Sequence, residues 1–380
     1  MKELTQILRA LENQPYDMLK KWALATLVTV EGSSYRRAGA RMLWRGEDLP
    51  PIGGISGGCL EDDLKIHCAD VVKTGVAKTI TYDTTSENDL VWGVGTGCHG
   101  IVRVLIEPAR QAVPALDLVR AAWARRAPAV VAIAFQFHHA NKRTRVKLGT
   151  LPKDAPARSA GFQPASTAKT RTAAKQTGSL RYGAAASFHT PNKSTTRIFP
   201  KLIGAPEIFF DYLPPPPALA IFGAGDDAQP LARMAAELGW QVHITDPRPA
   251  YATRERFPEA ATVGPTAPPL DDHTLAVVMT HHYIHDMPLL RDLLPRAGEL
   301  VYLGLLGPKK RAEKILADLK RDGLRITPDM RARLHAPVGL DIGAATPEAI
   351  ALSILAEMQS VLGNRDAKPL RDRAKAIYDA

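Results

Sequence analysis

The side chains best suited to chemistry in this chain of 380 residues are cysteines that stand next to glycines. Around Cys59 the backbone is glycine-rich, so it can adopt positive φ angles and let another molecule approach closely. The segment from Leu60 to Val72 has the pattern of a helix with acids in its first turn, so Cys59 stands at or just before a helix N-terminus. Such a position activates a thiol, whereas the adjacent carboxylates act in the opposite direction, and the sequence leaves the balance open. The residues that we expect to line a ligand site here are Ser56, Gly57, Gly58, Cys59 and Glu61.

A second turn of the same kind precedes the predicted strand Ile101 to Glu107, and its key residues are Gly97, Cys98 and His99. Two such turns in one small domain could meet and line one pocket with Cys59 and Cys98. Neither cysteine has a C-x-x-C partner, so spacing gives little support to a zinc site. Cys68 falls inside the predicted helix, and we expect it to be a small buried core residue.

A dinucleotide-binding pattern follows in the second half of the chain. The strand Ala218 to Phe222 leads into a glycine turn, a helix and a further strand that ends at Asp246, where a ribose-binding acid belongs. Asp226 and Asp227 would repel a diphosphate, whereas Arg248 could offset them or contact a 2′-phosphate. The residues that we expect to surround a nucleotide are Gly223, Gly225, Asp226, Ala228, Asp246, Arg248, Thr280, His281, Gly304 and Gly307.

Two further clusters flank the expected crevice. His281 and His285 are four residues apart and would share a helix face, as metal ligands can, but no further ligand is evident nearby. We therefore expect these histidines to line the crevice at the strand ends. The turn from Gly304 to Arg311 carries two glycines and three cations, which is typical of an anion site.

The remaining elements indicate an α/β protein. We expect a helix from Met1 to Lys20, strands from Trp22 to Val30 and from Ala77 to Tyr82, a helix from Pro114 to Arg125 with proline in its first turn, and a strand from Ala129 to Phe137. These form an N-terminal α/β domain, residues 1–137. Residues 208–380 form a Rossmann-like domain with a doubly wound parallel sheet. Its last predicted helix, from Ala349, has Thr346 as its N-cap and Pro347 at the first helical position.

Residues 138–207 are predicted to be a basic, low-complexity and disordered insertion. Between Asn141 and Lys201 there are thirteen Lys or Arg and one acid, so the rest of the chain is about neutral despite a net charge of +10. Its few aromatic residues form no stacking pattern, which favours a solvated tether over a nucleic-acid arm. No apolar run reaches membrane-spanning length and the start is not a signal peptide, so we expect a cytoplasmic protein with reduced thiols.

Several motifs, taken together and in order, resemble the XdhC/CoxI family, the accessory proteins for maturation of xanthine dehydrogenase and related molybdenum hydroxylases. The matching segments are Glu31 to Arg37, Gly57 to Glu61, Gly97 to Gly100, Ile221 to Gly225, Asp246 to Pro249, Met279 to His281, Gly304 to Gly307 and Gly339 to Gly343. They cover nearly all of the chain except the basic insertion, which is not a family feature. The family often has histidine where Asp226 stands.

The resemblance implies a protein that binds molybdenum cofactor, protects it while a cysteine desulfurase supplies sulfur, and delivers it to the large subunit of the apo-hydroxylase. It implies a homodimer that turns over no substrate of its own. Cys59 is the best candidate for the family's cofactor-associated cysteine and a possible molybdenum contact, with Cys98 second. To these we add Arg36, Arg37 and Arg41 as contacts for the pterin phosphate, because guanidinium groups suit phosphate. The alternative is an NAD(P)-dependent oxidoreductase with His281, His282 or His285 as proton donor.

Overall fold

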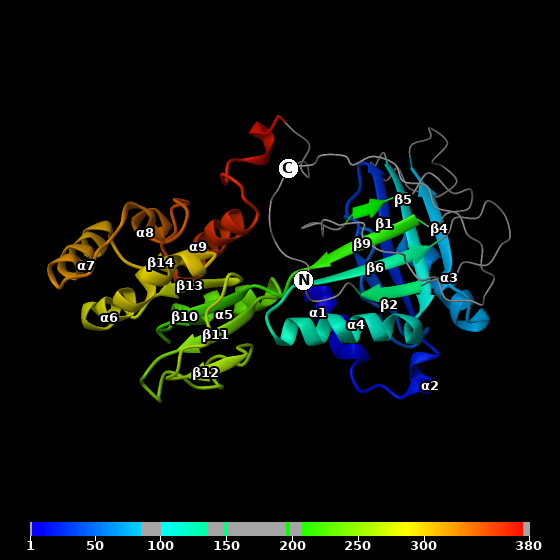
Figure 1. Ribbon diagram of the computed structural model, residues 1–380, viewed down its shortest axis with the longest axis horizontal. Helices are drawn as coiled ribbons and strands as arrows, with labels where there is room; N and C mark the ends of the chain where they lie inside the picture. The colour runs from blue at the N-terminus through cyan, green and yellow to red at the C-terminus, as the bar shows by residue number, and fades with distance from the viewer. Residues whose placement is uncertain (1, 85–99, 136–146, 151–194, 198–206, 375–380) are drawn as a thin grey trace, which may run out of the picture.

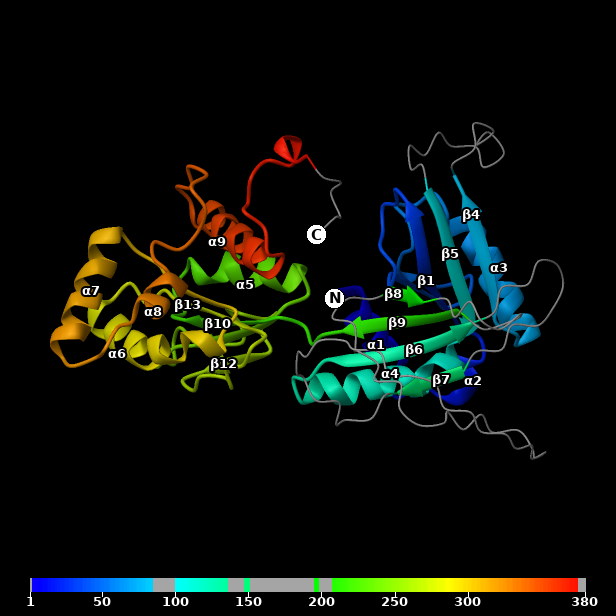
Figure 2. The same ribbon diagram turned by 45° about the horizontal axis from the view of Figure 1, so that its top comes forward.

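The computed structural model describes residues 2–84, 100–135, 147–150, 195–197 and 207–374. Figures 1 and 2 show two α/β bodies side by side, with the N-terminal one at the right and the C-terminal one at the left. Among the described residues, no helix has the length and apolar character needed to cross a membrane.

An antiparallel sheet of five strands, ordered β3-β2-β1-β5-β4, forms the first layer of the N-terminal body. Its strands are β1 (Ala23–Gly32), β2 (Arg41–Trp44), β3 (Ile52–Gly53), β4 (Lys78–Asp83) and β5 (Gly100–Pro108). The helix α3 (Glu61–Thr74) packs on β1 and β5 through Leu64, Cys68 and Val71. The predicted helix after Cys59 and the predicted core position of Cys68 are thus confirmed.

Three helices pack on the other side of the first sheet, and two of the predicted helices need correction. The single helix expected from Met1 to Lys20 is wrong: the chain forms α1 (Lys2–Leu11) and α2 (Tyr16–Leu19), because Asn13 has a φ of +56° and Pro15 follows. The helix α4 (Ala109–Ala124) begins directly after β5, so Pro114 lies inside it and not in its first turn.

A second antiparallel sheet, ordered β7-β6-β9-β8, completes the N-terminal body. It contains β6 (Ala129–Phe135), β7 (Lys147–Thr150), β8 (Thr195–Arg197) and β9 (Glu207–Leu213). Two expectations need correction. Residues 208–213, which we assigned to the C-terminal domain, belong to β9, and this strand pairs with β6 along its whole length. The predicted disordered insertion contributes β7 and β8. The other residues of that insertion lie outside the described part of the chain.

The C-terminal body is a parallel sheet with helices on both faces, as predicted. Its strand order is β12-β11-β10-β13-β14-β15, the order of a Rossmann fold. The strands are β10 (Ala218–Phe222), β11 (Gln241–Thr245), β12 (Thr262–Gly264), β13 (Thr274–Val278), β14 (Tyr302–Leu305) and β15 (Leu334–His335). In sequence β10, β13 and β14 are largely apolar runs, and each residue of β10 and β13 is buried.

The helices divide between the two faces of this sheet. On one face α5 (Ala228–Glu237) packs beside α9 (Pro347–Leu362), and on the other lie α6 (Tyr283–Leu293) and α7 (Lys309–Arg321) (Figure 2). The helix α9 begins as predicted, because the Thr346 side chain accepts a hydrogen bond from the Ala349 N–H and Pro347 follows. The remaining short helices are η2 (Leu294–Glu299), α8 (Pro328–Arg333) and η3 (Leu370–Asp372).

Arg126, just after α4, joins the two bodies. Its guanidinium group donates hydrogen bonds to Asp271 Oδ2 at 2.8 Å and to the Pro216 carbonyl at 2.6 Å, and it also reaches Gln241 Oε1 at 3.2 Å. Burial opposes ionisation of Asp271, but hydrogen bonds from Arg126 and Thr274 outweigh it and lower the pKa of Asp271 to about 2. One cation from the N-terminal body therefore binds three segments at the amino-terminal edge of the Rossmann sheet.

Candidate functional site

The turn that carries Cys59 is held by the side chains of Ser56 and Glu61. Glu61 Oε1 accepts hydrogen bonds from the backbone N–H groups of Ile55 at 3.0 Å and Ser56 at 2.8 Å, and Glu61 Oε2 accepts one from the Ser56 hydroxyl. The Ser56 hydroxyl oxygen accepts from the N–H groups of Gly58 and Leu60, both at 3.1 Å. The turn is therefore built by a carboxylate that reaches back from the first residue of α3.

This carboxylate remains charged over the physiological pH range. Burial opposes ionisation of Glu61, but hydrogen bonds from Ser56 and Ile55 outweigh it and lower the pKa of Glu61. Cys59 is exposed at the tip of the turn, whereas Cys68 is buried in the core, where burial raises its pKa to about 12. The structure thus separates an accessible thiol from an inert one.

Glycine is required at two places near this turn. Gly53 has a φ of +80°, and a Cβ atom there would lie 2.3 Å from the Arg41 carbonyl oxygen. A Cβ atom at Gly100 would lie 2.2 Å from the Ser33 carbonyl oxygen, so the start of β5 is in close contact with the segment that connects β1 to β2. At Gly57 a Cβ atom would lie 3.6 Å from the Tyr35 ring, so this segment also borders the Cys59 turn. The predicted residues Gly97, Cys98 and His99 lie outside the described residues.

The three arginines proposed as phosphate contacts differ in their surroundings. Arg36, Arg37 and Arg41 line a common cavity of 240 Å³, to which Glu3 also contributes. Arg36 forms an ion pair with Glu3, and its side chain is 28% exposed. Arg41 is buried, bonds Asp211 and donates to the Gly39 carbonyl at 3.0 Å, so its guanidinium group is engaged in the interior. Burial therefore argues against the phosphate contact expected of Arg41.

The glycine turn of the Rossmann body has the predicted form but an unexpected arrangement of charges. Gly223 has a φ of +120°, and a Cβ atom there would lie 2.5 Å from the Met279 carbonyl oxygen. Asp226 bonds Arg256 at 2.9 Å and Asp227 bonds His281 Nε2 at 2.7 Å. A Cβ atom at Gly225 would lie 2.7 Å from Asp227 Oδ1, so a carboxylate occupies the place where a diphosphate would approach.

Asp246, the expected ribose ligand, has its acceptor sites filled by the protein. Oδ1 accepts from the backbone N–H and the Nε of Arg248, both at 2.9 Å, and Oδ2 accepts from the Ala224 N–H at 2.8 Å and from Arg248 at 2.7 Å. Burial opposes ionisation of Asp246, but the hydrogen bonds from Arg248 outweigh it and lower the pKa of Asp246 to about 2. A carboxylate with four donors has no lone pair left for a sugar hydroxyl, so these residues do not fit a dinucleotide.

The histidines after β13 do not share a helix face, which corrects the prediction. His281 precedes α6 with a φ of +61° and faces Asp227, and His285 lies within α6. Within the described part of the chain, no group of three or more His, Cys, Asp or Glu side chains could hold a metal ion.

One of the three cations of the predicted anion turn is engaged within the protein. Arg311 forms an ion pair with the buried Asp286, which also accepts from the Thr280 hydroxyl. A Cβ atom at Gly304 would lie 2.7 Å from Val338, so this glycine serves packing, whereas Gly307 has a φ of +135° beside Arg311. Ala228 is buried at the start of α5.

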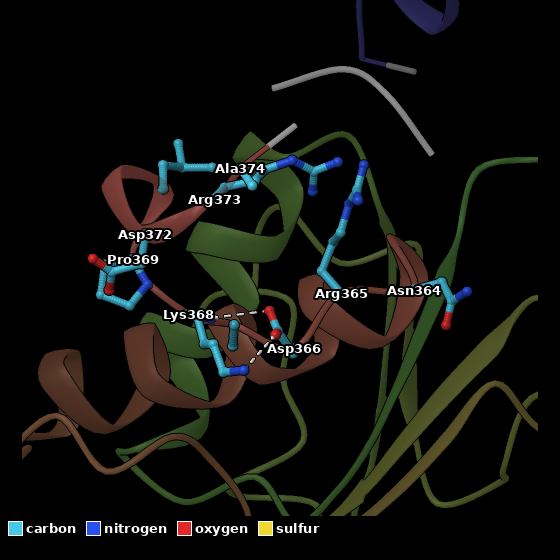
Figure 3. A pocket seen from close by; sticks show the side chains of 10 residues that line it. Asn364, Arg365, Asp366, Lys368, Pro369, Asp372, Arg373 and Ala374 are labelled. Carbon is cyan, nitrogen blue, oxygen red and sulfur yellow. Dashed lines mark hydrogen bonds and ion pairs between the residues drawn. The ribbon is translucent and has the colours of Figure 1, made fainter. Parts of the chain in front are cut away.

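A hollow of 540 Å³ lies within the segment after α9 (Figure 3). Its wall is formed by residues 364–370 and 372–374, and an ion pair of 3.1 Å joins Lys368 to Asp366 within it. These side chains are largely exposed and belong to a single stretch of chain, so we assign no function to it.

The fold and the site thus define a two-domain protein: a Rossmann domain follows an N-terminal α/β domain, which presents an exposed cysteine on a glycine-rich turn. The chain belongs to the XdhC and CoxI family: that family's model matches residues 19–83, and the model of the XdhC Rossmann domain matches residues 219–358.

Two curated relatives are similar to this chain over most of its length. A Bacillus subtilis protein described as a probable xanthine dehydrogenase subunit is 33% identical over 88% of this chain and 91% of its own length. The molybdenum cofactor insertion chaperone PaoD of Escherichia coli is 25% identical over 89% of this chain and 82% of its own. A crystal structure described as a xanthine dehydrogenase from Bacillus halodurans is 28% identical, covers 97% of this chain and 98% of its own, and superposes with a TM-score of 0.68.

Proposed function

We propose that this protein is a maturation factor that binds molybdenum cofactor and delivers it to the large subunit of an apo xanthine dehydrogenase-type hydroxylase. The family membership supports this role, and so does the likeness to PaoD, which is named as a molybdenum cofactor insertion chaperone. The cofactor is cargo here, and the chain performs no turnover of its own.

The observation that carries the proposal is the exposed Cys59 on a turn that is fixed before any cargo arrives. The side chains of Glu61 and Ser56 accept hydrogen bonds from five donors of the turn, so the turn needs little further ordering when a ligand binds. A thiolate is a soft ligand that suits a molybdenum centre. The residues that we propose around the cargo are Ser56, Gly57, Gly58, Cys59 and Glu61 from this turn, Arg36 and Arg37 for the phosphate, and Gly97, Cys98 and His99 from the second turn.

Three further features belong to the proposal. A cysteine desulfurase would supply the terminal sulfur of the bound cofactor, the chain would act as a homodimer, and it would work in the cytoplasm. The alternative role as an NAD(P)-dependent oxidoreductase is disfavoured, because Asp246 is saturated with donors and Asp227 blocks the diphosphate position.

Retention of molybdenum tests the role of Cys59. Purified full-length protein is mixed with molybdenum cofactor released from a molybdoenzyme, desalted without oxygen and assayed for molybdenum per chain. We expect Cys59→Ser to retain about tenfold less, the equivalent of about 1.4 kcal/mol in binding. Cys68→Ala is the matched control, because Cys68 is buried in the core. Equal retention by Cys59→Ser and wild type would reject Cys59 as the ligand, and no retention by the wild type would reject the function.

A further inference from the structure

A third cavity lies in the Rossmann body, at the carboxyl ends of β10, β11 and β13. Its volume is 280 Å³, and it is formed where the strand order reverses, the place at which such sheets bind ligands. Most of its wall is apolar. The side chains that the argument uses are Phe222, Arg248, Pro265, His285 and Leu289.

Arg248 forms a flat platform in this wall. Its Nε and terminal nitrogen bond Asp246 at 2.9 and 2.7 Å, which fixes the plane of the guanidinium group. The Tyr251 ring lies beside this guanidinium group, with 4.1 Å between the guanidinium carbon and the ring centroid. Arg248 lines the cavity, whereas Tyr251 does not. An oriented guanidinium group stacks well on planar rings.

The charges around the cavity disfavour the ribose diol and the diphosphate of a dinucleotide. The ion pair between Asp246 and Arg248 is neutral as a unit, and the carboxylate has no acceptor site left for a ribose diol. Asp227 lies against Gly225, where a diphosphate would meet the glycine turn. The cavity is therefore neutral overall and largely apolar, and its wall includes the paired guanidinium group of Arg248 and the side chain of His285.

We propose that this cavity binds a neutral planar nitrogen heterocycle of the purine or pterin class, stacked on Arg248, and does not bind nicotinamide dinucleotides. Phe222, Pro265 and Leu289 supply apolar contact for the ring, and His285 offers a nitrogen to its polar edge. The proposal does not depend on the cysteine turn, because the cavity is lined only by Rossmann residues.

Calorimetric titration of the full chain with adenosine, 6-hydroxymethylpterin, ADP and NAD⁺ tests the proposal. We expect adenosine or the pterin to bind, and ADP and NAD⁺ to bind at least about tenfold more weakly than the better of the two. Preference for the pterin would identify the ring as a pterin, and preference for adenosine as a purine. Absence of binding by both heterocycles, or binding of NAD⁺ as tight as theirs, would overturn the proposal.

Three variants test whether the heterocycle binds in this cavity. Leu289→Trp fills the cavity and should abolish binding, whereas Ile284→Trp on the same helix is the matched control, because Ile284 is 72% exposed and lies outside the cavity wall. Arg248→Lys keeps a cation beside Asp246 but loses the planar platform, so it should weaken heterocycle binding several-fold with the fold retained. Unchanged affinity in both Leu289→Trp and Arg248→Lys would show that the ligand binds elsewhere.

Discussion

Glu107 offers a direct test of the electrostatics inside the N-terminal body. This carboxyl group lies on β5, its residue is 2% exposed, and its Oε2 atom has no hydrogen-bond partner among the described residues. Burial raises the pKa of Glu107 to about 7, against the opposing attraction of Arg41. Arg41 is itself paired with the buried Asp211, so it neutralises Glu107 only in part.

The sign and size of the effect follow from the raised pKa. Between pH 4.5 and 7 the unfolded chain releases the Glu107 proton and the folded protein keeps it, so the free energy of unfolding falls as pH rises through this interval. Each pKa unit corresponds to about 1.4 kcal/mol, so the full loss is about 3 kcal/mol, complete above pH 7. Glu107→Gln keeps the shape of the protonated acid and removes this loss.

Urea unfolding at pH 5 and pH 8, followed by tryptophan fluorescence, measures this pH-dependent loss in the free energy of unfolding. Trp22, Trp44 and Trp123 lie in the N-terminal cores and report on this body. We expect Glu107→Gln to match the wild type at pH 5 and to be more stable by up to about 3 kcal/mol at pH 8. Glu47→Gln, at an exposed site, is the control and should leave the pH dependence unchanged. Parallel pH profiles for wild type and Glu107→Gln would refute the reasoning.

Two further substitutions test the joint between the bodies and the glycine turn. Arg126→Ala removes the hydrogen bonds to Asp271, Pro216 and Gln241, so we expect faster proteolysis of the linker at residues 214–217 and a free energy of unfolding lower by about 2 kcal/mol. Cleavage no faster than in the exposed control Arg125→Ala would contradict this. Gly223→Ala places a Cβ atom 2.5 Å from the Met279 carbonyl oxygen at a φ of +120°, so we expect thermal unfolding to show a free energy of unfolding lower by about 1–3 kcal/mol. Gly264→Ala is the control, because a Cβ atom there would meet open space, and it should not show this decrease.

The sequence predicts the Rossmann body well because its signals are local. The strand from Ala218, the turn at Gly223 and the strand before Asp246 follow one another within about thirty residues, and each pattern needs only its neighbours. The helix start at Thr346 is equally local, since cap and proline are adjacent. Such features were predicted at the correct positions.

The errors concern long-range pairing. The strand β9 pairs with β6 across a separation of more than seventy residues, and β7 and β8 arise inside a segment without apolar periodicity. No local pattern specifies partners at that distance, because antiparallel pairing is decided by the surrounding sheet and core. The predicted boundary at residue 208 therefore separates β9 from the body to which it belongs.

The candidate sites show the same limit. Motif spacing made Cys59 a candidate, and its place in a site stays a prediction. The role of Glu61 in holding the turn could not be predicted, because it depends on a backbone that folds back over six residues. The saturation of Asp246 was also missed, although one signal was present: an aspartate two residues before Arg248 can accept that residue's N–H in an Asx-type turn. Such a turn brings the arginine side chain back onto the same carboxylate.

The register of β6 and β9 has a consequence for the long basic segment between them. Phe135 and Glu207 face each other across the ladder, so β6 ends and β9 begins at neighbouring points about 5 Å apart. Lengthening a connection between fixed, adjacent ends changes its closure entropy only slowly. The length of this connection can therefore change without altering the register of the β6–β9 ladder, provided that β7 and β8, which the connection contributes to the two edges of the sheet, are kept.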